Sequence, residues 1–213
     1  MRAGLAVGAA LLGLCLPGVA ADHGGHAGHG HDSHDADDDL APAPVAPDSL
    51  FQLGSLWTTA QGEEVPLSAL GGRVQVLAMV YTHCEHACPR IVSDMRSVRR
   101  EIGDTGGRVG FALVSLDPER DDAKRLAEFA EQTGLGEDWL LLRAEDDAVR
   151  ELAAALGVRH RRVGERDFVH SNLISVLDPE GVVVHRQVGL GVDPERTVAA
   201  IRKLLEVSAS PPE

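Results

Sequence analysis

Two uninterrupted apolar runs constrain the fold of this chain more than any other feature. Residues 74–81 and residues 109–116 contain no charged side chain, and neither run alternates between polar and apolar positions. Such runs are typical of strands that are buried on both faces of a sheet. Residues 89–102 lie between them and have helical spacing, with Pro89 in the first turn. The three segments therefore predict a β-α-β unit with parallel strands and a right-handed crossover.

The rest of the chain predicts more helices and a C-terminal hairpin. Residues 173–177 and 182–188 are separated by the turn sequence Asp178-Pro-Glu-Gly181, which is typical of a β-hairpin. The predicted helices cover residues 121–133, 146–156 and 194–206, and shorter extended segments are expected at residues 51–53, 64–65 and 140–142. This order of elements predicts an α/β fold. We expect a mixed central sheet with helices on both faces and a C-terminal β-hairpin plus helix.

Length and composition exclude several classes of protein. The chain of 213 residues is long enough for one ordinary domain, which we expect over residues 48–207, with a disordered tail at residues 208–213. A formal net charge of −13 argues against a nucleic-acid partner. Only three cysteines are present, so a disulfide-stapled miniprotein and a four-cysteine metal site within one chain are excluded.

Residues 1–21 have the features of an export signal. Arg2 precedes an apolar run, and Ala20 and Ala21 provide small residues for cleavage before Asp22. The alternative is retention as a membrane anchor through residues 3–21, since this segment is nearly long enough to span a bilayer. Either outcome predicts an exported domain, in the periplasm or on the outer face of the cytoplasmic membrane.

Residues 22–47 are expected to be a disordered tail, because they contain few sizeable apolar side chains and many Gly, Ala, Pro and Asp residues. The tail contains five histidines, namely His23, His26, His29, His31 and His34. Imidazoles at this density can capture Cu(II), Ni(II) or Zn(II). A solvated linker with incidental histidines explains the same composition, and the sequence leaves both interpretations open.

The chemistry is concentrated at Cys84 and Cys88, where the first buried strand ends and a helix begins. Two residues four apart on a helix share one face with Cβ atoms about 5–6 Å apart, so both sulfurs can bind one ion or form a disulfide. The helix N-terminus is expected to favour their thiolates. Soft thiolates select Cu(I), with Zn(II) as a competitor. Dithiol oxidoreductases usually have Cys-x-x-Cys, which is one residue narrower.

Several motifs occur in an order that resembles one known family. They are Tyr81-Thr-x-Cys84-x-x-x-Cys88-Pro89, Val114-Ser-Leu-Asp117-Pro-Glu-Arg-Asp121, Trp139 followed by leucines, and His170-Ser171 followed by Leu177-Asp178-Pro-x-Gly181. With them the chain resembles the Sco/SenC family of copper-delivery proteins for cytochrome c oxidase, which have a thioredoxin-like fold. The resemblance implies that copper is bound by Cys84, Cys88 and His170. It also implies a partner, the copper-site subunit of the oxidase or another copper acceptor.

The chain departs from the family pattern at three places. Glu85 and His86 stand where the family usually has proline and aspartate, and Val169 stands where aspartate usually precedes the histidine. His83 and His86 are extra imidazoles beside the cysteines, and their role is left open, as is the choice between Cu(I) and Cu(II). Residues 159–169 are polar, and we expect a mobile, solvated loop that lets His170 approach and leave the metal.

Two functions follow from these residues. The first is a copper chaperone, which is a binding protein rather than an enzyme. The second is a thiol–disulfide reductase that keeps the cysteines of a copper acceptor reduced through the Cys84/Cys88 pair. The wider cysteine spacing and His170 favour the chaperone.

Overall fold

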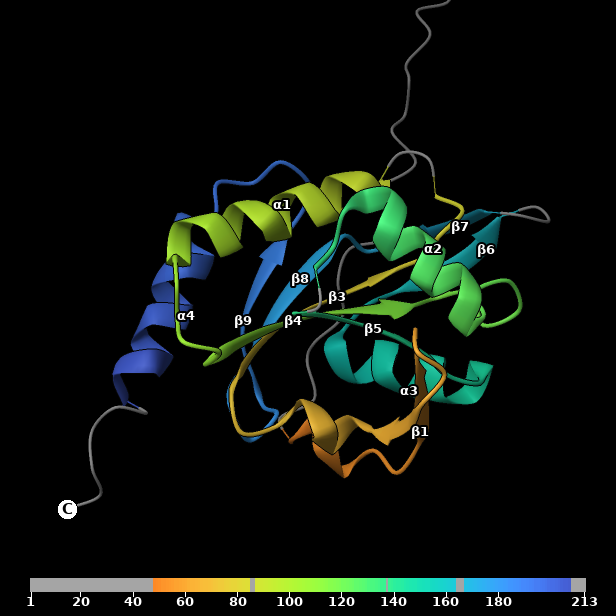
Figure 1. Cartoon of the computed structure of the whole chain (residues 1–213), viewed down its shortest axis with the longest axis horizontal. Coiled ribbons are helices and arrows are strands. Elements are labelled where there is room, and N and C mark those ends of the chain that lie inside the picture. Colours follow the sequence, from red (N-terminus) through yellow and green to blue (C-terminus); the bar gives the residue numbers. More distant parts are fainter. Residues whose placement is uncertain (1–47, 85–86, 137, 164–166, 208–213) are drawn as a thin grey trace, which may run out of the picture. The chain divides into compact units, whose positions relative to one another are not determined.

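The computed structural model describes residues 48–84, 87–136, 138–163 and 167–207 (Figure 1). The predicted signal at residues 1–21, the tails at residues 22–47 and 208–213, and His86 lie outside the described residues. No helix within the described ranges combines the length and the apolar character that a bilayer span requires.

Within the described residues, seven strands form one mixed sheet in the order β2-β1-β5-β4-β3-β8-β9. Strands β3, β4 and β5 are parallel, and the pairs β1–β2, β1–β5, β3–β8 and β8–β9 are antiparallel. The strands are β1 (Leu56–Thr59), β2 (Glu64–Pro66), β3 (Val74–Val80), β4 (Val109–Ser115), β5 (Trp139–Arg143), β8 (Leu173–Leu177) and β9 (Val183–Val188).

The predicted β-α-β unit is confirmed at the centre of this sheet. Every residue of β3 and of β4 is buried, as expected for strands that are covered on both faces. The two strands pair in parallel from Val74 opposite Val109 to Val80 opposite Ser115, and helix α1 (Ala87–Ile102) connects them. The chain therefore leaves the buried end of β3 directly into the segment that contains both cysteines.

Helices lie on both sides of the strands. Figure 1 shows α1 and α2 (Ala123–Thr133) above the sheet and α3 (Asp146–Leu156) below it, while α4 (Glu195–Val207) packs against α1 and β9. Helix α2 begins where Asp122 accepts a hydrogen bond of 2.7 Å from the Arg125 amide, and it ends at Gly134. The predicted α/β architecture, with its C-terminal hairpin and helix, is confirmed.

The N-terminal edge of the sheet differs from the prediction. Residues 51–53 were expected to be extended, but Leu50–Gln52 form a short 3₁₀ helix, which begins where the Ser49 hydroxyl accepts the Phe51 amide hydrogen at 3.1 Å. A local side-chain cap therefore outweighs the extended preference. The edge strand is β2, which contains the expected extended residues 64–65, and β1 lies between β2 and β5.

The segment before His170 is also different from the expected loop. Strands β6 (His160–Val163) and β7 (Asp167–His170) form a separate two-stranded sheet, in which His160 lies opposite His170. Two hydrogen bonds close the base of this hairpin, from the Ser171 amide to the Arg159 carbonyl at 2.8 Å and from the Arg159 amide to Oγ of Ser171 at 3.1 Å. Phe168 on β7 packs against the ring of Tyr81, with 5.3 Å between the centroids, and this contact helps to hold the hairpin against the domain.

The turn between β8 and β9 provides a test of the packing at the N-terminal edge. Gly181 has φ +88°, and a Cβ atom there would lie 2.6–2.7 Å from ring atoms of Phe51, whereas Gly62 has φ +83° and open space around it. Both alanine substitutions lose about 1 kcal/mol to the left-handed backbone. We expect Gly181→Ala to lose about 1–3 kcal/mol more through overpacking. Urea unfolding measures both, and equal losses for the two variants would contradict this packing.

Candidate metal centre

Both cysteines lie at the junction between β3 and α1. They are present as thiols, and Cys84 is half-buried whereas Cys88 is fully buried. Sγ of Cys84 accepts the Cys88 amide hydrogen at 3.3 Å, so it serves an amide at the start of α1 that has no partner within the helix. Sγ of Cys88 accepts the Tyr81 amide hydrogen at 3.4 Å. The two sulfurs are therefore held on the side of the helix that faces the end of β3.

Burial dominates the electrostatics of Cys88. Desolvation raises the pKa of the Cys88 thiol well above its usual value, and the hydrogen bond and charge of Cys84 raise it further. The amide of Tyr81 lowers this pKa but does not offset the burial. The expectation that the helix N-terminus favours the thiolate is therefore wrong for Cys88, because desolvation penalises the charged form more than the helix favours it.

Tyr81 lies between the cysteines and the hairpin. Its hydroxyl hydrogen-bonds with the Cys84 side chain, and burial is the main cause that raises the pKa of Tyr81. The same oxygen accepts the Phe168 amide hydrogen at 3.5 Å. Its ring meets the His170 ring edge-on, with 6.1 Å between the centroids. Tyr81 thus contacts Cys84 through its hydroxyl, Cys88 through its backbone amide, and the strand that ends in His170 through its hydroxyl and ring.

His170 is oriented by the backbone that follows it. The residue is 2% exposed, and Nδ1 of the imidazole lies 3.2 Å from the carbonyl oxygen of Ser171. A carbonyl oxygen can only accept a hydrogen bond, so Nδ1 carries the proton and Nε2 carries the lone pair that binds metals. The residue before His170 is Val169, which has no carboxylate that could accept the Nδ1 proton. The carbonyl oxygen of Ser171 accepts it instead and orients the ring.

The structure brings Cys84, Cys88 and His170 into contact with one residue, Tyr81, but not to a common metal-ligand spacing. Among the described residues, the group of potential ligand atoms that lie within 4.8 Å of one another consists of His83, Asp117 and Asp121. A metal ion bound by both sulfurs and the imidazole therefore requires a further approach of these side chains. Two thiolates and one imidazole remain a donor set suited to Cu(I).

Two carboxylates beside the site, Asp117 and Asp121, were not predicted to be functional residues. Both belong to the motif that follows the second buried strand. Asp121 is fully buried and accepts three hydrogen bonds, from the Thr82 amide at 3.1 Å, the Thr82 hydroxyl at 2.6 Å and the Ser115 hydroxyl at 2.5 Å. Nδ1 of His83 lies 3.6 Å from Oδ1 of Asp121. His83 therefore faces this carboxylate network.

Arginines neutralise the same network. Arg120 forms an ion pair with Oδ2 of Asp117, and Nη2 of Arg162 lies 3.9 Å from Oδ1 of Asp117. Nε of Arg125 donates to the Thr82 hydroxyl at 2.9 Å. A divalent cation among these carboxylates would meet the repulsion of the nearby guanidinium groups. The network is better suited to positioning Thr82, two residues before Cys84, than to holding a second metal.

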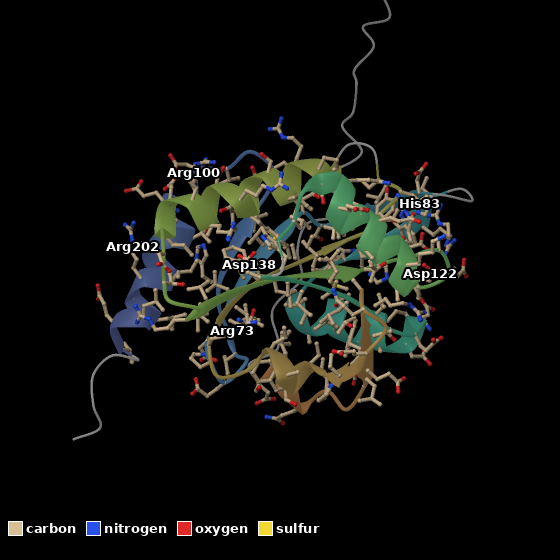
Figure 2. The ribbon with its side chains drawn as sticks, viewed as in Figure 1. Arg73, His83, Arg100, Asp122, Asp138 and Arg202 are labelled. Atoms are coloured by element: carbon tan, nitrogen blue, oxygen red, sulfur yellow. The ribbon has the colours of Figure 1, made fainter. Side chains whose placement is uncertain are left out.

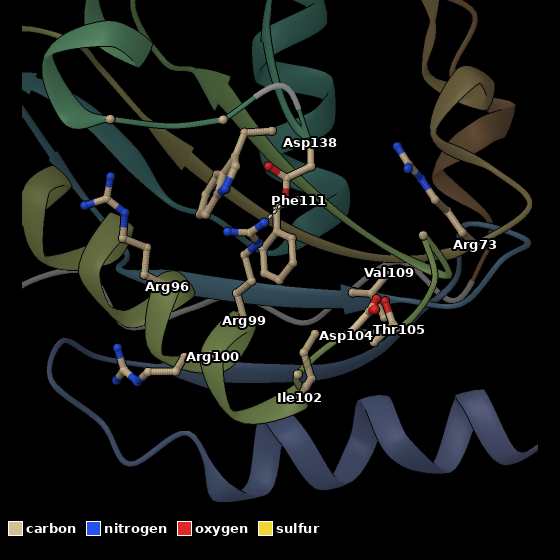
Figure 3. A pocket seen from close by; sticks show the side chains of 15 residues that line it. Arg73, Arg96, Arg99, Arg100, Ile102, Asp104, Thr105, Val109, Phe111 and Asp138 are labelled. Carbon is tan, nitrogen blue, oxygen red and sulfur yellow. Dashed lines mark ion pairs between the residues drawn. The ribbon is translucent and has the colours of Figure 1, made fainter.

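A cavity of about 650 Å³ lies toward the opposite end of the sheet, at the start of β4 and the end of α1 (Figure 3). The rings of Phe111 and Trp139, 5.1 Å apart, form part of its wall, and Arg99 pairs with Asp138 at 2.5 Å. Figure 2 likewise places His83 at one end of the molecule and Arg100 at the other. Neither cysteine nor His170 lines this cavity, so it is separate from the candidate metal centre.

Comparison with known proteins gives one consistent family. The family model described as SCO1/SenC matches residues 50–206. A SCO1 protein homolog from Bacillus subtilis is 27% identical over 127 residues, which is 58% of this chain and 66% of the relative. The chain therefore spans slightly less than two thirds of that relative.

Solved structures share the fold. Arabidopsis thaliana ScoI with copper bound has a TM-score of 0.63 at 18% identity, covering 79% of this chain and 99% of that one. BsSco, a member of the Sco family of cytochrome c oxidase assembly proteins in which a disulfide switch was identified, has a TM-score of 0.62 at 21% identity, covering 78% and 96%. The thioredoxin-like prediction is confirmed by this similarity.

The carboxylate network can be tested through two adjacent aspartates. Asp121→Asn places an amide that donates hydrogen bonds among three donors, and we expect a loss of about 2–3 kcal/mol in the free energy of unfolding. Asp122→Asn is the matched control, since Asn and Asp are equivalent at a helix N-cap and the change should be below about 0.5 kcal/mol. Urea titration followed by circular dichroism measures both, and equal losses would argue against the network.

The different burial of the cysteines predicts different reactivity. In the reduced, metal-free protein at neutral pH, iodoacetamide should modify Cys84 about tenfold faster than Cys88, because Cys88 is buried and protonated. Peptide mass spectrometry follows both sites over time. Unfolding in urea is the control and should bring the two rates together. Faster modification of Cys88 in the folded protein would show that the assigned burial is wrong.

Proposed function

Because the chain belongs to the SCO1/SenC family, we propose that it handles copper for the assembly of cytochrome c oxidase. In this proposal it binds one copper ion through Cys84, Cys88 and His170. It then delivers the ion to the copper-site subunit of the oxidase or to another copper acceptor. The observation that carries the proposal is the gathering of these three side chains around Tyr81.

The chemistry of the donors supports copper as the cargo. Two sulfurs and one imidazole form a soft set that favours Cu(I), and Cu(II) is the alternative. Cys88 is held as a neutral thiol by burial, so metal binding must release its proton. The Ser171 carbonyl leaves Nε2 of His170 as the nitrogen for the metal. Copper affinity is therefore expected to increase with pH.

Delivery requires ligands that can separate. Cys84 lies in the loop before α1 and Cys88 in its first turn, whereas His170 lies on a hairpin outside the main sheet. Movement of the hairpin can bring the imidazole to the sulfurs and withdraw it again. During transfer, each bond from copper to this chain is replaced by a bond to an acceptor ligand. The ion remains Cu(I), so no oxidant or reductant is consumed.

A thiol–disulfide reductase is the second candidate, and the burial of the two cysteines favours it. Half-buried Cys84 is accessible to an acceptor disulfide, while buried Cys88 lies next to it and can resolve the mixed disulfide. The acceptor disulfide gains two electrons as the bond between Cys84 and Cys88 forms. BsSco, of similar fold, has a disulfide switch.

The predicted export signal supports a location outside the cytoplasm, in the periplasm or on the outer face of the cytoplasmic membrane. Residues 3–21 provide an anchor if the signal is retained. This location agrees with a role in delivering copper to an acceptor domain that faces the same compartment.

An anaerobic Cu(I) titration of the reduced full chain tests the proposed ligands. We expect His170→Ala to weaken retention of the first copper equivalent by at least about tenfold, while oxidation of the dithiol stays nearly intact. X-ray absorption should show two sulfur neighbours and a nitrogen neighbour that is lost in the variant. His185→Ala is the control, since His185 hydrogen-bonds to Thr197 on the other side of the domain. Unchanged copper retention in His170→Ala would reject the chaperone and favour the reductase.

A further inference from the structure

The hairpin that carries His170 lies outside the main sheet. Strands β6 and β7 pair only with each other within the described residues. Phe168 packs against Tyr81, and its amide reaches the Tyr81 hydroxyl at 3.5 Å. Because His170 ends β7, any displacement of the hairpin also displaces the imidazole.

Arg162 on β6 connects the hairpin to the rest of the domain through ion pairs. Nη2 of Arg162 lies 3.0 Å from Oε2 of Glu119 and 3.9 Å from Oδ1 of Asp117. Its guanidinium also lies over the ring of Phe168, which is opposite in the hairpin, at 5.0 Å from the centroid. Among the described residues, these are the ion pairs that join the hairpin to the loop after β4.

The carboxylate that Arg162 approaches belongs to the network beside Cys84. Asp117 is fully buried, and its amide donates to the Ser115 hydroxyl at 2.9 Å. Ser115 donates to Asp121, which in turn accepts both hydrogen bonds from Thr82. A continuous chain of polar contacts therefore connects β6, the other strand of the His170 hairpin, with the loop of Cys84.

We propose that Arg162 is a latch that holds the His170 hairpin closed and thereby sets the rate at which copper leaves the protein. This inference rests on the proposed function, since it requires His170 to bind the metal. With the latch closed, Arg162 holds β6 and β7 against the loop after β4. The imidazole then stays beside Tyr81, from where a side-chain approach to the two sulfurs completes the copper site. Opening breaks the contacts with Glu119 and Asp117, the hairpin moves, and His170 leaves the metal first.

The position of Arg162 suits this role better than that of its neighbours. Its side chain is 37% exposed and Glu119 is 71% exposed, so their ion pair is weak enough to open without unfolding the domain. Asp117 is buried and already paired with Arg120, so the network stays charge-balanced when Arg162 leaves. Arg161, the adjacent residue, is exposed and has no ion pair with a described carboxylate. It provides a matched control with the same change in charge.

The test is the rate of copper release from the reduced, Cu(I)-loaded full chain. Anaerobic stopped-flow with a saturating Cu(I) chelator, bicinchoninate, measures this rate. We expect Arg162→Ala to release copper about tenfold faster, through loss of two ion pairs and one cation–π contact. Glu119→Gln should release it about threefold faster, because Asp117 and Phe168 still hold the arginine. Arg161→Ala should match the wild type.

A second background shows whether the latch acts through His170. In the His170→Ala background, Arg162→Ala should have no further effect on release, because the ligand that the latch controls is absent. If Arg162→Ala accelerates copper release equally in the wild-type and His170→Ala backgrounds, the latch is rejected. A general loosening of the fold would raise the release rate in both backgrounds. The latch is also rejected if Arg162→Ala releases copper as slowly as Arg161→Ala does.

Failure of the proposed function gives a different result. If His170→Ala and the wild type release copper equally, His170 is not a ligand and the chaperone itself is rejected. If His170→Ala releases copper faster than the wild type but Arg162→Ala does not, the chaperone proposal is retained and the latch is rejected. Thermal unfolding verifies that each variant folds. Should Arg162→Ala fail to fold, the surface variant Glu119→Gln decides, and release at the wild-type rate then rejects the latch.

Discussion

The site depends on the hydrogen bonds that the buried carboxylate of Asp121 accepts. An unpaired buried charge would destabilise the fold by several kcal/mol. Here the amide and hydroxyl of Thr82 and the hydroxyl of Ser115 solvate it. Thr82 follows β3 and Ser115 ends β4, so satisfying this charge holds the ends of two neighbouring strands together. The start of the cysteine segment is thereby fixed relative to the sheet.

The candidate site has two parts, which are the cysteine segment attached to the main sheet and the hairpin that carries His170. The cysteines are tied to α1 and β3 by hydrogen bonds between sulfur and backbone amides. His170 is tied to a two-stranded hairpin that is not part of the main sheet. Tyr81 contacts both parts through its hydroxyl and its ring. In the proposed delivery of copper, this division lets one ligand leave while the other two stay in place.

The sequence patterns predicted the centre of the fold better than its edges. Strands β3 and β4 were predicted because burial on both faces leaves an unbroken apolar run, and helices α1 to α4 because their apolar spacing and caps are local. Phe51 was misassigned because a single hydroxyl, that of Ser49, ends the extended chain. The hairpin of β6 and β7 was missed because its residues are polar. Its order comes from Tyr81 and Glu119, which are distant in sequence.

The sequence alone indicated the residues that we propose to carry the chemistry. Cys84 and Cys88 are close because a spacing of four residues is local, and the family motifs pointed to His170. Only the tertiary structure decided how these groups are held. It buried Cys88 enough to keep its proton, oriented His170 through the Ser171 carbonyl, and joined Arg162 to Asp117. Desolvation and contacts between distant segments exist only after the chain has packed, so no local pattern records them.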